Sequence, residues 1–159
     1  MPTTQTTPSK TRWLSTDEQA AWRSFLAMQK QIRETLERQL QRDAGMPMTY
    51  YIILAMLSEA PDRTMRMTEL AAIAGTSQSQ LSHAATRLED AGWIERRRCL
   101  DDKRGYLAVL TDAGFQVLSK AAPGHVESVR SVLFDALNPE QVHQLKEISD
   151  AVTTRSDAV

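Results

Sequence analysis

The middle of the chain carries a run of short polar side chains whose types and spacing suit contacts with a nucleic acid. The run is Ser77-Gln78-Ser79-Gln80, and it is continued by Ser82, His83 and Arg87. A glutamine can pair with adenine through two hydrogen bonds, a serine can bond a base edge or a phosphate, and an arginine can reach a phosphate or a guanine. The same run would also suit a solvated helix terminus rich in capping residues. Taken alone, this segment leaves both interpretations open.

A second cluster, which is strongly basic, surrounds a polar turn further along the chain. Arg96-Arg97-Arg98 precede this turn, and Asp102-Lys103-Arg104 lie at its far side. An arginine at such a tip can enter a minor groove, and we expect the carboxylate of Asp102 to hold the guanidinium of Arg104 in position. The net charge of the whole chain is only −1, so DNA binding would have to depend on this local charge. The alternative is a solvated turn in which Asp101 and Asp102 neutralise the basic residues.

Two short helices across a tight turn are expected to present the polar run. Thr68 is a suitable N-cap for a helix over residues 68–74, Gly75 would end it, and a second helix would restart at Thr76-Ser77 and close at Gly92. Small residues near the turn let the two helices cross closely, which is the helix-turn-helix pattern. Residues 93–98 and 106–110 have the composition of antiparallel strands, so the basic turn would be the tip of a hairpin.

Long amphipathic helices are predicted on both sides of this region. Apolar residues recur every three or four positions between Ser15 and about Arg42, and Ser15 and Glu18 have the spacing of a capping box. Such a helix would span about 40 Å, which is longer than a small domain requires, so we expect it to reach a second chain. The apolar run within Met48–Glu59 predicts a helix that is buried on nearly all sides.

The C-terminal part of the chain predicts two further helices. Thr111 is the expected N-cap of the first, whose apolar stripe continues past Pro123-Gly124, where we expect a kink or a division. Asn138-Pro139 would begin the last helix, because asparagine is a good N-cap and proline suits the first helical position.

Length and composition favour a single soluble globular domain. The chain has 159 residues, of which 25% are charged, and no apolar run approaches the roughly 20 residues of a membrane-spanning helix. We divide it into a flexible tail or arm (1–14), dimerisation helices (15–45 and 112–155) and a helix-turn-helix region with its hairpin (46–111), all within one intertwined domain. The N-terminus shows no secretory signal, and the single cysteine excludes an internal disulfide, so a cytoplasmic location is expected.

Several of these residues resemble the MarR family of winged-helix transcription regulators. The matching residues are Leu70-Ala71, Ser82, Leu88-Glu89, Gly92, Asp102-Lys103-Arg104-Gly105, Leu110-Thr111 and Gly114. The resemblance implies a mainly α fold with about six helices and a small β-hairpin. It also implies a homodimer in which the first helix and the last two form the interface, and each winged helix-turn-helix binds one half of a palindrome in double-stranded DNA. A pocket for a small, often phenolic or aromatic, effector would lie between the dimerisation and DNA-binding regions, as in a ligand-responsive repressor.

The sequence departs from this pattern in the recognition helix, where no basic residue occurs before Arg87. Candidate effector-pocket residues are Met46, Met48, Tyr50 and Tyr51, for which ordinary core packing is the competing interpretation.

Three other functions compete with this interpretation. Cys99 lies beside basic residues and could make the protein a redox-responsive regulator, although a packed strand cysteine is the simpler explanation. The chain could also be a helical dimeric module that binds protein instead of DNA. His83, His125 and His143 lack metal-ligand spacing, and no catalytic motif is present, so neither an enzyme nor a metal or other cofactor is expected.

Overall fold

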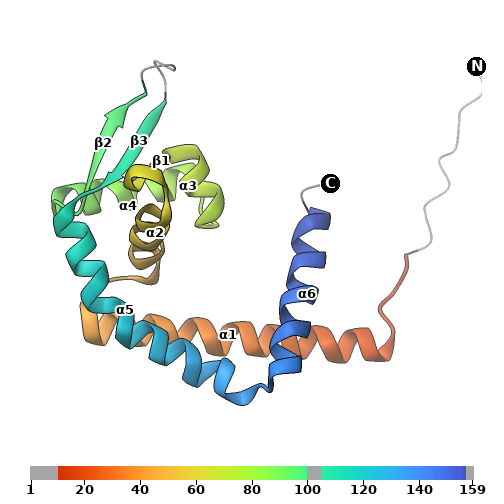
Figure 1. Ribbon diagram of the computed structural model, residues 1–159. Coiled ribbons are helices and arrows are strands. Elements are labelled where there is room, and N and C mark those ends of the chain that lie inside the picture. Colours follow the sequence, from red (N-terminus) through yellow and green to blue (C-terminus); the bar gives the residue numbers. More distant parts are fainter. Residues whose placement is uncertain (1–10, 100–104, 157–159) are drawn as a thin grey trace, which may run out of the picture.

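The computed structural model describes residues 11–99 and 105–156, and they form a small helical lobe mounted on long helices (Figure 1). The long helices are α1 (Thr16–Ala44), α5 (Asp112–Val132) and α6 (Pro139–Ser156). The lobe contains α2 (Met48–Glu59), α3 (Met67–Ile73), α4 (Gln78–Asp90) and the strands β1 (Thr64–Arg66), β2 (Ile94–Arg98) and β3 (Tyr106–Leu110). Two short 3-10 helices, η1 (Pro61–Arg63) and η2 (Phe134–Ala136), complete the described elements.

The lobe is held together by one apolar core. Helix α2 supplies Ile53, Leu54 and Leu57, which are fully buried, and α4 supplies Leu81 and Leu88. The predicted helix at Met48–Glu59 has the predicted bounds. It is buried as expected, because α3, α4 and the sheet enclose its apolar residues.

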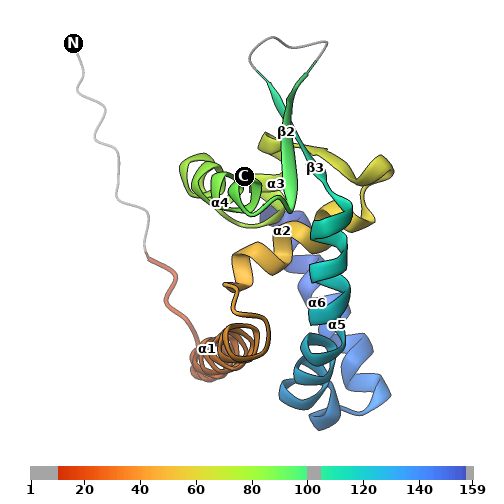
Figure 2. The same ribbon diagram turned by 90° about the vertical axis from the view of Figure 1, so that its left-hand side faces the viewer.

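The sheet has three strands in the order β1-β3-β2, all antiparallel. The predicted hairpin is confirmed as β2 and β3, with Arg98 paired with Tyr106 at the end next to the segment that connects the two strands. It projects from the lobe away from α1, as Figure 2 shows. The third strand, β1, pairs Thr64 with Val109 and Arg66 with Leu107 at the sheet edge. The sequence predicts at most a short extended pair, Arg66-Met67, because three residues are too few to show the alternation of a strand.

Local bounds differ from prediction at two helices. Helix α3 begins at Met67 with Arg66 as its N-cap, so the assignment of Thr68 as the cap was wrong. The reason is that β1 leads into the helix without an intervening turn. Helix α5 runs undivided through Pro123 to Val132, so the expected division does not occur. Its packing along α1 brings Gly124 close to the side chain of Gln39, where an added Cβ would lie 3.3 Å from Nε2.

The long helices leave large apolar side chains exposed. On α1, Trp22, Phe25 and Leu26 are each more than 40% exposed, and on α6 Ile148 and Val152 are each 63% exposed. No residue of α6 whose side chain is described is buried. Within residues 11–99 and 105–156, no helix combines the length and hydrophobicity needed to cross a membrane.

Candidate nucleic-acid interface

Helix α4 places the polar run on the surface of the lobe. Leu81, Ala84, Ala85 and Leu88 face the core, so the remaining sides of the helix carry its polar residues. Gln78, Ser79, Ser82, His83 and Arg87 are all exposed. The structure thus brings these five predicted residues together on one exposed helix surface.

Two other residues of the run are occupied in capping the same helix. The Oγ of Ser77 accepts a hydrogen bond from the backbone N–H of Gln80 at 3.1 Å, and the Oε1 of Gln80 accepts one from the backbone N–H of Ser77 at 3.1 Å. This reciprocal pair is a capping box, which satisfies two backbone donors that a helix start leaves free. The capping box occupies Ser77 Oγ and Gln80 Oε1 as acceptors, so each side chain could contact a base only through its remaining donor groups.

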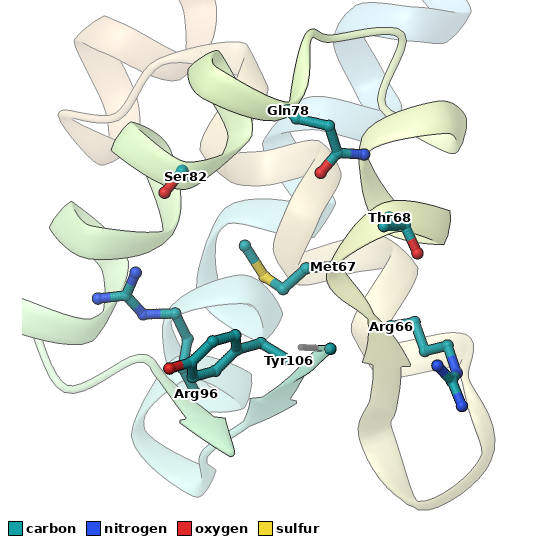
Figure 3. A pocket seen from close by; sticks show the side chains of 8 residues that line it. Arg66, Met67, Thr68, Gln78, Ser82, Arg96 and Tyr106 are labelled. Carbon is teal, nitrogen blue, oxygen red and sulfur yellow. The ribbon is translucent and has the colours of Figure 1, made fainter. Parts of the chain in front are cut away.

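A groove of about 440 Å³ separates the beginning of α4 from the β-sheet and the start of α3 (Figure 3). Gln78 and Ser82 extend from α4, and Arg66 and Thr68 lie on the opposite side. The remaining lining residues are Met67, Arg96, Gly105 and Tyr106. Sequence reasoning did not predict the Arg66–Thr68 wall, because its proximity to α4 depends on the pairing of β1 with β3.

Arg96 is fixed within the lobe and does not belong to the exposed rim that its sequence position suggested. Its Nη2 lies 2.7 Å from Oε2 of Glu89, and its backbone N–H donates to Oε1 of Glu89 at 2.9 Å. The backbone hydrogen bond and then the guanidinium hydrogen bond from Arg96 lower the pKa of Glu89 below its usual value. This pair connects the end of α4 to β2 and so helps to fix the orientation of α4 relative to the hairpin.

Arg97 and Arg98, the other basic residues of β2, are exposed. Arg97 pairs with Glu95 at 2.7 Å on the same strand, and the guanidinium carbon of Arg98 lies 5.9 Å from the centroid of the Tyr106 ring. Asp102, Lys103 and Arg104, the predicted tip, lie outside the described residues. Cys99 is 8% exposed at the base of the tip, and its backbone N–H donates to the carbonyl of Gly105 at 3.0 Å.

The motif around Thr111 joins the hairpin to α5. The Oγ1 of Thr111 donates to the carbonyl of Gly92 at 2.7 Å and accepts from the backbone N–H of Gly114 at 3.0 Å. Gly114 is required because an added Cβ would lie 2.1 Å from the carbonyl oxygen of Trp93. Thr111 therefore caps α5, as predicted, and also binds the end of the α4–β2 turn.

The four predicted effector-pocket residues do not share one cavity. Met46 and Tyr51 belong to the core, and the ring of Tyr51 lies 4.1 Å from that of His125. Met48 lines a cavity of about 430 Å³ between α1, α2 and the α3–α4 turn, and Tyr50 lines a neighbouring cavity of about 620 Å³. Arg33 and Thr76 line both cavities, and sequence reasoning missed both residues. The periodicity of α1 indicates only that one face of that helix is apolar.

The part of the chain that the structure describes contains no group of three or more histidine, cysteine or acidic side chains placed to hold a metal ion.

Comparisons with known proteins agree with this geometry. A family model described as the MarR family matches residues 44–105. A crystal structure of Sco3205, a MarR family transcriptional regulator from Streptomyces coelicolor in complex with DNA, is 50% identical, covers 91% of each chain and has a TM-score of 0.86. That of AbsC, a MarR family regulator from the same organism, is 40% identical, covers 94% of this chain and 100% of AbsC, and also has a TM-score of 0.86. The transcriptional repressor MprA of Escherichia coli strain K12 is 27% identical over 135 residues, which are 85% of this chain and 76% of MprA.

Proposed function

The chain belongs to the MarR family of transcriptional regulators, and we propose that it is a cytoplasmic repressor that binds a palindromic site in double-stranded DNA as a homodimer. Helix α4 would enter the major groove, and the β2–β3 hairpin would reach the adjacent minor groove. The solved relative that is bound to DNA and the relative named as a repressor support this proposal.

The observation that carries the proposal is the groove between α4 and the sheet. If α4 lies in a major groove and the hairpin in the next minor groove, one sugar-phosphate strand must pass between them. The groove lies at that position, and Ser82, Thr68 and Tyr106 supply hydroxyl groups along it. Hydroxyl groups and arginines are common partners of phosphate oxygens, so the lining suits a DNA backbone.

The exposed residues of α4 would contact different parts of the DNA, depending on their position along the helix. Gln78, Ser79, Ser82 and His83 stand near its N-terminal half, which is the part of a recognition helix that meets base edges. Arg87, one to two turns further along, would contact a phosphate or a guanine. Ser77 and Gln80 were also candidates for DNA contact, but their capping-box hydrogen bonds indicate that their main role is to stabilise the start of α4.

The basic hairpin would add contacts that do not depend strongly on base sequence. Arg97 and Arg98 are exposed along β2, and the Asp102/Arg104 pair with Lys103 remains our candidate for the minor-groove contact. Because such contacts displace counterions, binding should weaken steeply as salt is added.

A homodimer would cover the apolar surfaces of α1 and α6. An 18-residue helix without a described buried side chain needs a partner surface, and a second copy of the chain would supply one. The two recognition helices would then be about 34 Å apart, or a multiple of this, to meet successive turns of DNA.

The cavity between α1, α2 and the α3–α4 turn is our candidate for a small aromatic effector. Phe25, Met28 and Ile32 give it an apolar wall, while Arg33 could pair with a carboxylate. The Oγ1 of Thr76 is buried without a hydrogen-bond partner in the described structure, and a ligand hydroxyl could satisfy it. A ligand there would change how the lobe sits on α1, and so shift the population of DNA-competent dimers.

The test is a selection of bound fragments from the source genome, followed by anisotropy titrations over a range of salt. We expect a salt-sensitive complex, with Arg98→Ala reducing the slope of log affinity against log salt by about 1. Gln78→Ala should relax sequence preference with the slope unchanged, and Lys146→Ala on α6 serves as a charge control. Recovery of no fragment, together with no salt-sensitive complex, would contradict DNA binding and favour a protein-binding module.

The effector is tested separately, by adding hydroxybenzoates to the DNA complex. Release by one of them, and loss of that release in Thr76→Val, would support the cavity. Thr154→Val is the matched control, because Thr154 is exposed on α6, far from α4, and lines neither cavity. Release that is unchanged in Thr76→Val would place the effector elsewhere.

A further inference from the structure

The corner between α2 and β1 has an unusual backbone. Asp62 and Arg63 have φ angles of 52° and 53°, and they are the non-glycine residues with positive φ among those that the structure describes. This left-handed region is sterically disfavoured for L-residues with a Cβ. Locally, the backbone N–H of Arg63 donates to the carbonyl of Ala60 at 3.0 Å. The backbone N–H of Thr64 also donates to the carbonyl of Pro61, and the Oγ1 of Thr64 donates to the carbonyl of Asp62 at 2.9 Å. These bonds hold the turn itself, and the side chain of Arg63 connects the turn to α5.

The side chain of Arg63 is clamped onto the first turn of α5. Its Nη1 lies 3.0 Å from Oδ1 of Asp112, and its guanidinium carbon lies 4.1 Å from the centroid of the Phe115 ring. Asp112 is almost fully exposed, so the ion pair alone would contribute little. The ring contact adds a cation–π interaction, and the two together give the guanidinium a defined position. We call Arg63, Asp112 and Phe115 the corner clamp.

The corner clamp anchors one wall of the groove. Directly after Arg63 the chain forms β1 and then enters α3, which together supply Arg66, Met67 and Thr68 to the groove. Strand β1 has only three residues and lies at the sheet edge, bonded to β3 alone. So short an edge strand is weakly held by its ladder, and its position depends on what fixes its ends.

We propose that Arg63 is a positioning residue for DNA binding: the corner clamp holds the β1–α3 wall on α5, so that the groove keeps the width that a DNA strand requires. This inference rests on the proposed function of the groove. It assigns Arg63 no contact with DNA. Because α5 also belongs to the proposed dimer frame, the clamp would connect the groove wall to the part of the molecule that sets the spacing of the two lobes.

The first test replaces Arg63 with glycine, which removes the clamp and at the same time removes the disfavoured Cβ from the left-handed backbone. We expect Arg63→Gly to unfold at a urea concentration close to that of the wild type. Amide hydrogen exchange at residues 64–68 should become at least tenfold faster, and affinity for the selected DNA should fall about tenfold. The salt slope should stay unchanged, because no phosphate contact has been removed.

Two further variants separate positioning from other roles. Phe115→Leu removes the ring beneath the guanidinium without changing charge, and it should reproduce the faster exchange and the weaker binding. Asp62→Gly relieves the same backbone strain but leaves the clamp intact, so exchange at residues 64–68 and affinity should match those of the wild type.

Wild-type exchange at residues 64–68 in both Arg63→Gly and Phe115→Leu would overturn the proposal. A fall of about 1 in the salt slope of Arg63→Gly would also overturn it, because Arg63 would then bind a phosphate directly. If the wild-type protein formed no DNA complex, the proposed function would fail. The exchange measurement needs no DNA, and would still decide for or against the clamp.

Discussion

At the scale of single residues, Gly114 lies where the backbone of Trp93 leaves no space for a Cβ atom. Its ideal Cβ position lies 2.1 Å from the carbonyl oxygen and 2.9 Å from the carbonyl carbon of Trp93, both of which belong to the backbone. Relief would have to move the α4–β2 turn away from α5. We expect Gly114→Ala to lower the free energy of unfolding by about 3 kcal/mol or more, measured by urea denaturation.

Gly92→Ala is the matched control for that prediction. Gly92 has a φ of 74°, but nothing lies within 4 Å of its Cβ position. Its replacement should therefore cost only about 1 kcal/mol, from the left-handed backbone. Gly114 itself lies in α5 without a positive φ, so equal losses in the two variants would contradict the predicted clash with the backbone of Trp93.

The Glu89–Arg96 pair makes a prediction about pH. Since the pKa of Glu89 is lowered in the folded state, first by the backbone N–H and then by the guanidinium of Arg96, the charged carboxylate stabilises the fold above its unfolded-state pKa. That contribution should be lost as the pH falls below about 4.5, through the folded-state pKa. Both side chains are partly exposed, so screening limits the contribution to roughly 0.5–1 kcal/mol.

The measurement compares wild type with Glu89→Gln by urea denaturation between pH 7 and pH 3. Other carboxylates also titrate in this range, so the difference between the two proteins isolates Glu89. We expect the wild type to be more stable at pH 7 and the two to converge at the acidic end. A difference that is constant over the whole range would show that charge on Glu89 does not contribute.

At the scale of elements, α4 combines residues that stabilise it with residues that face outward. The Ser77–Gln80 capping box stabilises its first turn, while Ser79 is exposed on the same turn. We expect Ser77→Ala to lower the free energy of unfolding by about 1 kcal/mol. Ser79→Ala should leave stability unchanged and weaken DNA binding up to tenfold. If Ser77→Ala had no effect on stability, the capping box would not explain where α4 starts.

The bounds of most helices could be predicted because the deciding residues are local. Ser15 with Glu18 caps α1 through the predicted capping box, and Thr111 caps α5. Strand β1 could not be predicted, because its partner, Val109 for Thr64, is distant in sequence. The continuation of α5 past Pro123 likewise depends on packing against α1, which no local pattern reveals.

The candidate site could be predicted only in part, for a similar reason. Residue types identified the exposed polar positions of α4, but they could not show that Gln80 is occupied in capping or that Arg96 is bonded to Glu89. In the sequence, a glutamine or an arginine that contacts DNA looks the same as one that is bonded within the protein. The roles of individual residues in DNA contact, including those at the hairpin tip, stay predictions.

At the scale of the whole molecule, the lobe and the long helices differ in how completely they are packed. The lobe shares one core with Leu40 of α1 and with Leu118 and Ala121 of α5, whereas α6 stands apart from the lobe in Figure 1 and has no described buried residue. Apolar side chains on α6 recur at Val142, Leu145, Ile148 and Val152, which is the spacing of one helix face. We expect α6 to be stable in this position when a second copy of the chain covers its apolar face.

The last prediction follows from this exposed face. Ile148→Glu would place a charge in the proposed interface, where burial without a partner is costly, so the protein should sediment as a single chain at micromolar concentration. Affinity for a palindromic site should fall more than tenfold, because one lobe then binds without its partner. Thr154→Glu, on the opposite side of α6, adds the same charge and should leave both the mass and the affinity unchanged. A dimer that persists in Ile148→Glu would mean that α6 lies outside the interface. The spacing of the two recognition helices would then have to be set by α1 and α5 alone.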